Sequence, residues 1–489
     1  MSMYFSLQNL CDLDITRPVC DMAAFFDYEL VEDNTIQIAA LPKLNLAYAK
    51  QERSVSAVFG AGEQEFASTQ PCHSEAGAEP TSGEITRCIK LAVVDVFEQA
   101  IGERPAFPWG VLTGVRPGKL AHKLLDAGIK AEALPNYLQQ AYLLPQQQGK
   151  LLTQIAVKQK QILSDSSRFT DAGIYIGVPY CPSRCSYCSF PAGIVPADEE
   201  SQQNFVNLIE QDVLNVVQLL SMHSLAIRSL YIGGGTPTSL NDKAFARLLD
   251  VVRKHLRFPE VAEFTVEAGR PDCFSSNKLA AMEAAGVDRI SVNPQTFHDK
   301  TLQVIGRRHS VDDFYRAYDE VRSSSIPVIN MDLIIGLPVE NAVDIDYSLH
   351  KAVALAPENL TIHTLTLKRS AALFGSKIQL PAEQAAELVE QGRELAAGMG
   401  LEPYYLYRQH YMLGHLANIG YAKPGTESIY NIQMMEERHP VIGVGPSSST
   451  KLPLADGHHL RRMNMPKNVA VYGQGLTEFC QKREELFCK

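Results

Sequence analysis

The sequence has 489 residues, of which 45 are basic and 55 are acidic, so its formal net charge is −10. Its 45% apolar and 20% charged residues are typical of a globular enzyme and exclude wholesale disorder. The acidic balance argues against a nucleic-acid partner but allows a local basic pocket. No segment approaches the roughly 20 apolar residues of a membrane span, and no export signal is evident. We therefore expect a cytoplasmic protein whose ten cysteines are thiols, and we expect it to be a monomer.

Residues 1–165 are expected to form an α+β domain of unknown role. The segment 108–128 contains the only tryptophan, Trp109, and its glycines and prolines predict a turn that leads into a helix. Arg116 and Lys119 in this segment are candidates for contact with a substrate or an electron donor. The other elements expected here are strands over 35–40 and 55–60, a loop near 62–84, and helices over 85–102 and 138–163.

Residues 166–372 alternate between buried apolar strands and amphipathic helices, which predicts a parallel sheet with helical crossovers. Ser275 or Ser276 is expected to cap one of these helices, and Ser310 with Asp313 another. A partial (β/α)6 barrel and an open doubly wound sheet both satisfy the pattern, and in either fold ligands gather at the carboxyl ends of the strands. The expected strands lie at 173–178, 228–234, 263–268, 288–293, 327–336 and 359–367.

Residues 373–489 are expected to form a mostly helical domain that covers the substrate. A helix is predicted near 381–399, followed by an aromatic run over 404–412 and a glycine-rich segment over 441–446. The chain is then expected to close with a charged helix. The pair His458 and His459 is more typical of a solvated turn than of a metal site.

Three cysteines lie within eight residues, at Cys181, Cys185 and Cys188, with the spacing C-x3-C-x2-C. Three thiolates on one loop can converge on a metal centre. A structural zinc site normally has four protein ligands, and no second pair of cysteines lies nearby. An iron–sulfur cubane takes one cysteine per iron, so three cysteines leave one iron open for a ligand. A zinc knuckle and three buried thiols are the alternatives. Tyr187 and Phe190 are expected to shield the loop from water.

This motif, with an aromatic residue before the last cysteine, resembles the signature of radical S-adenosylmethionine (SAM) enzymes. The resemblance implies a 4Fe–4S cluster held by Cys181, Cys185 and Cys188, whose fourth iron is chelated by SAM. It also implies reductive cleavage of SAM to a 5′-deoxyadenosyl radical, and it favours the partial (β/α)6 barrel over the doubly wound sheet.

Further motifs resemble the oxygen-independent coproporphyrinogen III oxidase (dehydrogenase) family, which covers roughly residues 171–450. Three blocks, at 112–120, 362–370 and 404–432, resemble its longer HemZ-like branch and extend the likeness over almost the whole chain. The segment 233–238, GGGTPT, matches a stretch whose backbone holds the methionine end of SAM in that family. By this resemblance the cofactor-binding residues are Tyr175, Tyr187, Gly234, Gly235, Thr236, Glu267, Gln295, Arg307, Asp332 and Thr366.

The chain departs from the founding oxidases at several positions. Gly177 stands where they have histidine, and Ser189-Phe190 where they have a further cysteine. Thr366 stands where they have alanine. A second SAM site is implied beside the first, and its residues would be Gly235, Thr236, Gln295, Arg307, Asp332 and Thr366.

The resemblance implies coproporphyrinogen III as substrate, with two propionates converted to vinyl groups to give protoporphyrinogen IX. Reduced flavodoxin or ferredoxin is the implied electron donor. The same family includes haem chaperones, which keep the cluster motif without this reaction, so that function stays open as the alternative. His363 is expected in a strand or pocket. A polyanionic substrate needs cationic partners, for which the candidates are Arg307, Arg308, Lys368, Arg369 and Arg408.

Overall fold

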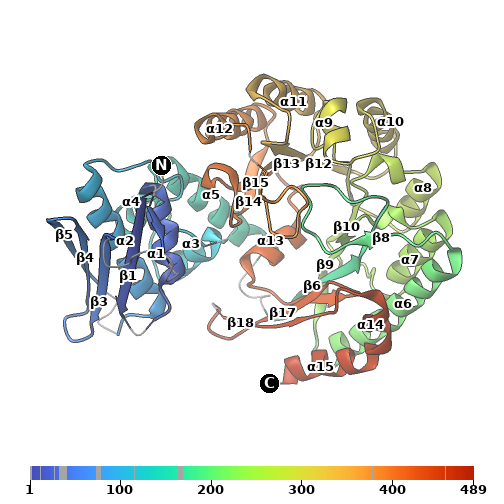
Figure 1. Ribbon diagram of the computed structural model, residues 1–489. Coiled ribbons are helices and arrows are strands. Elements are labelled where there is room, and N and C mark those ends of the chain that lie inside the picture. Colours follow the sequence, from blue (N-terminus) through green and yellow to red (C-terminus); the bar gives the residue numbers. More distant parts are fainter. Residues whose placement is uncertain are drawn as a thin grey trace. The chain divides into compact units, whose positions relative to one another are not determined.

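The structure is a computed structural model that describes residues 3–11, 13–26, 28–31, 41–72, 79–114, 116–163, 169–376, 378–457 and 459–488 (Figure 1). The chain divides into two compact units, Met1–Gly114 with Ile129–Lys150, and Val115–Gly128 with Leu151–Lys489. This division differs from the predicted limits at 165 and 372, which remain a prediction. The strand expected over 35–40 and the residue His458 lie outside the described residues.

The first unit is built on a five-stranded sheet in the order β2-β1-β3-β4-β5, with β1 parallel to β2 and β3 and the remaining pairs antiparallel. Its core forms because Val55, Ala57 and Phe59 alternate on one face and pack with the apolar side of α2. Strand β5 lies inside the segment predicted as a loop. The elements are β1 (Met3–Leu10), α1 (Thr16–Ala23), β2 (Tyr28–Leu30), β3 (Lys43–Ala49), β4 (Ser54–Ala61), β5 (Gln64–Pro71), α2 (Ser82–Ile101) and α4 (Leu134–Tyr142).

The helix predicted over 138–163 is two helices, because α4 ends at Tyr142 and α5 spans Gln146–Ile162. Leu143 adopts a left-handed conformation with φ 54°, which ends α4. Pro145 then lacks an amide hydrogen and disfavours the helical conformation at the preceding residue. The Gln and Leu pattern continues through the break, so composition alone did not reveal it.

The second unit contains an eleven-stranded sheet, in which six parallel strands lie side by side in their order along the chain. A doubly wound sheet reverses its strand order, whereas this sequential order is that of a partial (β/α)6 barrel, which confirms the prediction. Each strand is buried on both faces along most of its length. The six strands are β6 (Asp171–Val178), β9 (Ala226–Gly234), β10 (Glu263–Glu267), β11 (Arg289–Ser291), β12 (Val328–Ile335) and β13 (Asn359–Thr364).

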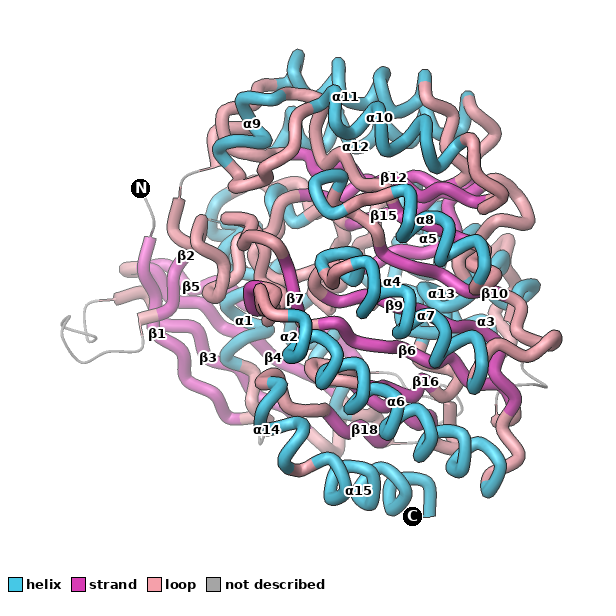
Figure 2. The backbone as a smooth tube through the Cα atoms, turned by 90° about the vertical axis from the view of Figure 1, so that its right-hand side faces the viewer, coloured by secondary structure: helices cyan, strands magenta, loops and turns pink. Residues whose placement is uncertain are grey.

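Helices connect these strands and cover the outside of the sheet, where Figure 2 shows α6, α7 and α8 side by side. The predicted caps are confirmed, since Ser275 accepts a hydrogen bond from the Lys278 amide and Ser310 forms a capping box with Asp313. No described helix is long and apolar enough to cross a membrane. The helices are α6 (Glu199–Met222), α7 (Asp242–His255), α8 (Ser276–Ala284), α9 (Asp299–Val304), α10 (Val311–Arg322) and α11 (Ala342–Ala354), with α3 (Pro117–Asp126) in the same unit.

The last part of the chain has more residues in helices than in strands, as expected, but its strands extend the sheet at both edges. β15 pairs with β13, and the glycine-rich segment predicted over 441–446 forms β16, which runs parallel to β6. The elements are α12 (Ala382–Gly398), β14 (Glu402–Tyr407), β15 (Asn418–Ala422), α13 (Ile429–Glu436), β16 (Val441–Val444), β17 (Ser449–Pro453), β18 (Leu460–Asn464), α14 (Val469–Gln474) and α15 (Leu476–Cys488).

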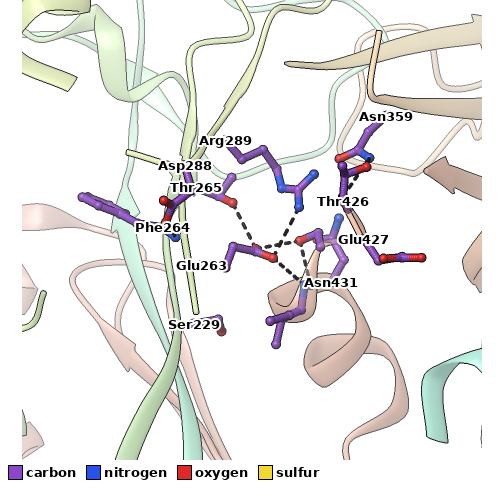
Figure 3. Close-up of polar contacts among 12 residues, drawn as sticks. Ser229, Glu263, Phe264, Thr265, Asp288, Arg289, Asn359, Thr426, Glu427 and Asn431 are labelled. Carbon is purple, nitrogen blue, oxygen red and sulfur yellow. Dashed lines mark hydrogen bonds and ion pairs between the residues drawn. The ribbon is translucent and has the colours of Figure 1, made fainter. Parts of the chain in front are cut away.

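α13 packs against β9 and the start of β10, where a buried carboxylate holds its amino end (Figure 3). Glu263 opens β10 and accepts hydrogen bonds from the Ser428 hydroxyl at 2.9 Å and the Ile429 amide at 2.5 Å. Thr265 donates to the same carboxylate, and Arg289 forms an ion pair with it at 3.5 Å. A carboxylate at the amino end of a helix is stabilised by the helix dipole. These contacts anchor the amino end of α13 to the start of β10.

Candidate active site

The three loop cysteines line one cavity of about 210 Å³ at the carboxyl ends of the strands. The loop begins directly after β6 and is pinned by two short paired strands, β7 (Tyr180–Cys181) and β8 (Gly193–Ile194). Cys181 Sγ lies 3.6 Å from Thr236 Oγ1, and Cys188 Sγ accepts a hydrogen bond from the Phe190 amide at 3.4 Å. Burial raises the pKa of the Cys181 and Cys188 thiols. A bound metal centre would be needed to hold them as thiolates.

The donor set fits a cluster, in which each of the three thiolates can bind its own iron. Within the part of the chain that the structure describes, no three His, Cys, Asp or Glu side chains come together as a mononuclear site requires. In a cubane each thiolate binds its own iron, so the three sulfurs stand apart around a shared cavity. The three thiols line one shared cavity, as such a cluster requires.

The glycine segment after β9 brings backbone close to the cysteine loop. Gly234 has φ +117°, which side-chain-bearing residues rarely adopt. The Gly235 amide donates to Val178 O at 2.8 Å, and the Thr236 amide donates to Tyr180 O at 2.7 Å. A Cβ on Gly235 would lie 2.3 Å from the Tyr180 carbonyl oxygen, so only glycine fits. Gly235 and Thr236 line the cavity of the cysteines.

Glu267 lies at the end of β10 and faces the same cavity. It accepts hydrogen bonds from the Tyr231 hydroxyl at 2.5 Å and from the Gly234 amide at 3.0 Å. Burial raises the pKa of Glu267 to about 7, although these two donors act in the opposite direction. The carboxylate therefore fixes the glycine segment and remains able to change its charge near neutral pH.

Gln295, Arg307 and Asp332 complete the far wall of this cavity. Gln295 has φ 65°, and its backbone bonds to Asp332 O and to the Ile334 amide, each at 3.0 Å. Burial pushes the pKa of Asp332 up, but the nearby His363 and a hydrogen bond from Asn330 outweigh it and leave the pKa below its usual value.

Both terminal guanidinium nitrogens of Arg307 form hydrogen bonds within the protein. Its Nη1 donates to Gly269 O at 3.0 Å and to Asn293 O at 2.9 Å, and its Nη2 donates to Tyr187 Oη at 3.3 Å. Arg307 thus holds the aromatic residue of the cysteine motif against the strand ends.

Tyr175 is the one predicted cofactor residue that lines neither this cavity nor the one next to it. Its ring stacks with Tyr231 and Tyr430 at centroid distances of 6.1 and 5.8 Å. Two residues later, a Cβ on Gly177 would lie 2.6 Å from Pro446 O. The close passage of the segment after β16 therefore explains why this chain has no histidine at Gly177.

A second cavity, of about 580 Å³, adjoins the first and shares Tyr187, Cys188, Phe190 and Gln295 with it. Thr366 lies here with Gly234, so the predicted residues of a second SAM are divided between the two cavities. Of the predicted cations, Lys368 lines this cavity, and burial lowers its pKa. His363 also faces it, with Nδ1 3.4 Å from Tyr407 Oη and Nε2 3.7 Å from Asp332 Oδ2.

The other predicted cations lie elsewhere. Arg408 is buried and donates to Leu416 O and His415 O, while Arg308 and Arg369 are exposed. Arg116 and Lys119 form ion pairs with Glu437 at 2.6 and 3.0 Å, at the end of α13.

Sequence reasoning missed Arg270, a buried residue of the first cavity that contacts the cysteine loop. It lies three residues after Glu267, in the loop that follows β10. A cation at the carboxyl end of a predicted strand was the available signal.

Comparison with known proteins places this arrangement in a family. Residues 175–352 match the model of the radical SAM superfamily. The chain is 36% identical over 390 residues to the oxygen-independent coproporphyrinogen-III oxidase-like protein HemZ of Bacillus subtilis, covering 78% of each chain. It is 31% identical to the haem chaperone HemW of Escherichia coli, over 59% of this chain and 72% of that protein.

Among solved structures, coproporphyrinogen III oxidase (HemN) of Escherichia coli, a radical SAM enzyme, superposes with a TM-score of 0.52 at 18% identity. The match covers 66% of this chain and 72% of the other. This likeness concerns the fold, and the sequence identity to HemZ carries the family. The chain belongs to the radical SAM superfamily and, within it, to the oxygen-independent coproporphyrinogen-III oxidase-like family that includes HemZ.

Proposed function

We propose that the protein is an oxygen-independent coproporphyrinogen III dehydrogenase, which converts two propionates to vinyl groups and gives protoporphyrinogen IX. The observation that carries this proposal is the adjacency of the two cavities. The cavity of the cysteines suits the group that generates the radical, and the larger cavity suits a bulky substrate. Tyr187, Cys188, Phe190 and Gln295 line both cavities, so the two ligands would lie on either side of these residues.

Cys181, Cys185 and Cys188 would each hold one iron of a 4Fe–4S cluster. The backbone of Gly234–Thr236, with Glu267 beside it, would hold SAM. Cluster and SAM together supply, when bound, a radical that removes a hydrogen atom from a propionate side chain. Phe190 and Tyr187 stand at the junction of the cavities, where their rings exclude water from the reacting groups.

Substrate recognition is assigned to the rim of the larger cavity. A propionate carboxylate can pair with the Lys368 ammonium, whose side chain is exposed and lines this cavity. His363 and Tyr407 offer further hydrogen-bond donors on the same wall. Reduced flavodoxin or ferredoxin is the proposed source of the electron.

The test is anaerobic reconstitution with iron and sulfide, followed by reduction and addition of SAM and coproporphyrinogen III. We expect protoporphyrinogen IX and 5′-deoxyadenosine to form together. Lys368→Met should raise KM with little loss of iron, while Lys243→Met, which removes an exposed lysine on α7, should change neither.

Cleavage of SAM without a vinyl product would overturn the proposal in favour of another radical reaction. Stable binding of haem without turnover would overturn it in favour of a haem chaperone, a function that the similarity to HemW supports as the second candidate.

A further inference from the structure

A buried arginine donates a hydrogen bond to one cysteine of the loop. Arg270 Nη1 lies 3.5 Å from Cys185 Sγ and 3.3 Å from Ser183 O. Cys185 is the most buried of the three cysteines, and Arg270 is only 3% exposed. Contact between a guanidinium and a sulfur therefore takes place where water screens it little.

The guanidinium is held from its opposite side. Asp272 accepts from Arg270 Nε at 2.9 Å and from Nη2 at 2.7 Å, a bidentate pair, and Nη2 also donates to Ser183 Oγ at 2.9 Å. His309 Nδ1 lies beside this carboxylate, 3.7 Å from Asp272 Oδ1. Every nitrogen of the guanidinium has a partner, so the orientation of Nη1 toward the sulfur is fixed.

We propose that Arg270 is a positioning residue that sets the reduction potential of the cluster through its hydrogen bond to the Cys185 sulfur. The inference rests on the proposed role of Cys185 as a ligand of the cluster. It does not depend on the identity of the substrate.

The expected direction follows from charge. One-electron reduction adds one negative charge to the cluster and its thiolates. A donor N–H aimed at a ligand sulfur stabilises that added charge, and hydrogen bonds to the sulfurs are a known determinant of cluster potentials. Arg270 therefore makes the cluster easier to reduce, while Asp272 limits the effect because its charge opposes that of the guanidinium.

The test is an anaerobic redox titration of the reconstituted full-length protein with dithionite, followed by EPR and performed without SAM or substrate. We expect Arg270→Met to shift the midpoint potential to a more negative value at unchanged iron and sulfide content. Arg270→Lys, which keeps the charge but loses the planar fork, should lie between Arg270→Met and the unaltered protein.

Arg257→Met is the matched control. Arg257 also pairs with an aspartate, Asp288, and donates to a backbone carbonyl, but at the start of β10, away from the cysteine loop. Its removal should leave the potential unchanged.

An unchanged potential in Arg270→Met at full iron content would overturn the inference, as would an equal shift in Arg257→Met. Should Arg270→Met assemble no cluster, Arg270→Lys decides, since a negative shift supports the inference and an unaltered potential refutes it. A separate Cys185→Ala protein that keeps its full iron would instead refute the ligand assignment.

Discussion

Cys185, at 9% exposure, lies deepest of the three loop cysteines, and all three open into one cavity. If they hold the cluster, replacing any one of Cys181, Cys185 or Cys188 by alanine removes the ligand of one iron. We expect the iron content after anaerobic reconstitution to fall to near background in each variant. Cys273→Ala is the control, because Cys273 is equally buried but does not line the cavity. Iron and sulfide analysis with the visible absorption spectrum gives the measurement.

His122 and Glu436 form a buried pair whose pKa values shift in opposite directions on folding. His122 Nε2 lies 2.8 Å from Gln159 Oε1 and 3.4 Å from Glu436 Oε2. Burial lowers the pKa of His122 from 6.5 to about 4 and raises the pKa of Glu436 from 4.5 to about 7. Between pH 4.5 and 6.5 these shifts favour a proton on the histidine in the unfolded chain and on the carboxyl in the folded chain. They therefore favour a contact between neutral groups over an ion pair.

The two groups have opposite effects on stability as the pH changes. Above pH 4.5 an unfolded Glu436 loses its proton, so its contribution to folding falls as the pH rises to about 7. His122 contributes a gain as the pH rises from about 4 to 6.5. In the natural protein these contributions nearly cancel.

We expect Glu436→Gln to leave the effect of His122 without its opposing contribution. The free energy of unfolding of this variant should then rise with pH between pH 4 and 6.5, by up to about 1.4 kcal/mol per pH unit relative to the natural protein. His122→Gln should show the opposite trend. Urea unfolding at a series of pH values measures both, and parallel profiles for the two variants would contradict the prediction.

At the scale of elements, the turn between β9 and α7 depends on backbone contact with the cysteine loop. We expect Gly235→Ala to cost on the order of 2 kcal/mol in the free energy of unfolding, because the new methyl group meets the Tyr180 backbone. SAM affinity, measured by calorimetry on the reconstituted protein, should fall as well. Gly193→Ala is the control, since its Cβ would approach only Pro179 O, at 3.9 Å. Unaltered stability and affinity in Gly235→Ala would contradict the close packing.

The six core strands could be predicted from the sequence because each is buried on both faces and reads as an apolar run. β12, predicted over 327–336, spans Val328–Ile335, and β10, predicted over 263–268, spans Glu263–Glu267. β16 was missed, since its four residues include a glycine and are too short to show a period. β5 was missed because its exposed positions carry polar residues and because the strand lies beside a low-complexity stretch.

The candidate site could be predicted where a motif is local and not where it joins distant loops. The cysteine motif is recognisable because its three cysteines lie within eight residues of the sequence. The bond between Arg270 and Cys185 joins residues 85 positions apart, and no spacing rule connects them. The sequence offered five candidate cations for the substrate. The fold alone shows that Lys368 lines the larger cavity, whereas the Arg408 guanidinium donates to backbone carbonyls.

At the scale of the whole second unit, α15 near the end of the chain is bound to α6, the first helix of the barrel. Arg483 on α15 and Asp212 on α6 form an ion pair in which neither side chain is exposed. The Gly445 amide and the Tyr472 hydroxyl also donate to Asp212. Removing one partner of such a pair leaves a charge buried without compensation.

We expect Arg483→Met to lower the free energy of unfolding by about 3–5 kcal/mol. The double variant Asp212→Asn with Arg483→Met should lose clearly less, because no buried charge is left unpaired. Chemical denaturation of the three proteins tests this, and equal losses in the single and double variants would contradict it.

The pairing of β6 with β16 affects the chain while the ribosome synthesises it. β6 ends at Val178, and its neighbour on one side begins only at Val441. At typical rates of translation, roughly ten seconds to a minute separates their synthesis. Throughout that interval the strand next to the cysteine loop presents an unpaired edge, which is a template for association with other chains. The nascent chain is therefore most prone to aggregation before this long-range pairing forms. A chaperone that bound the unpaired edge of β6 would act during the same interval.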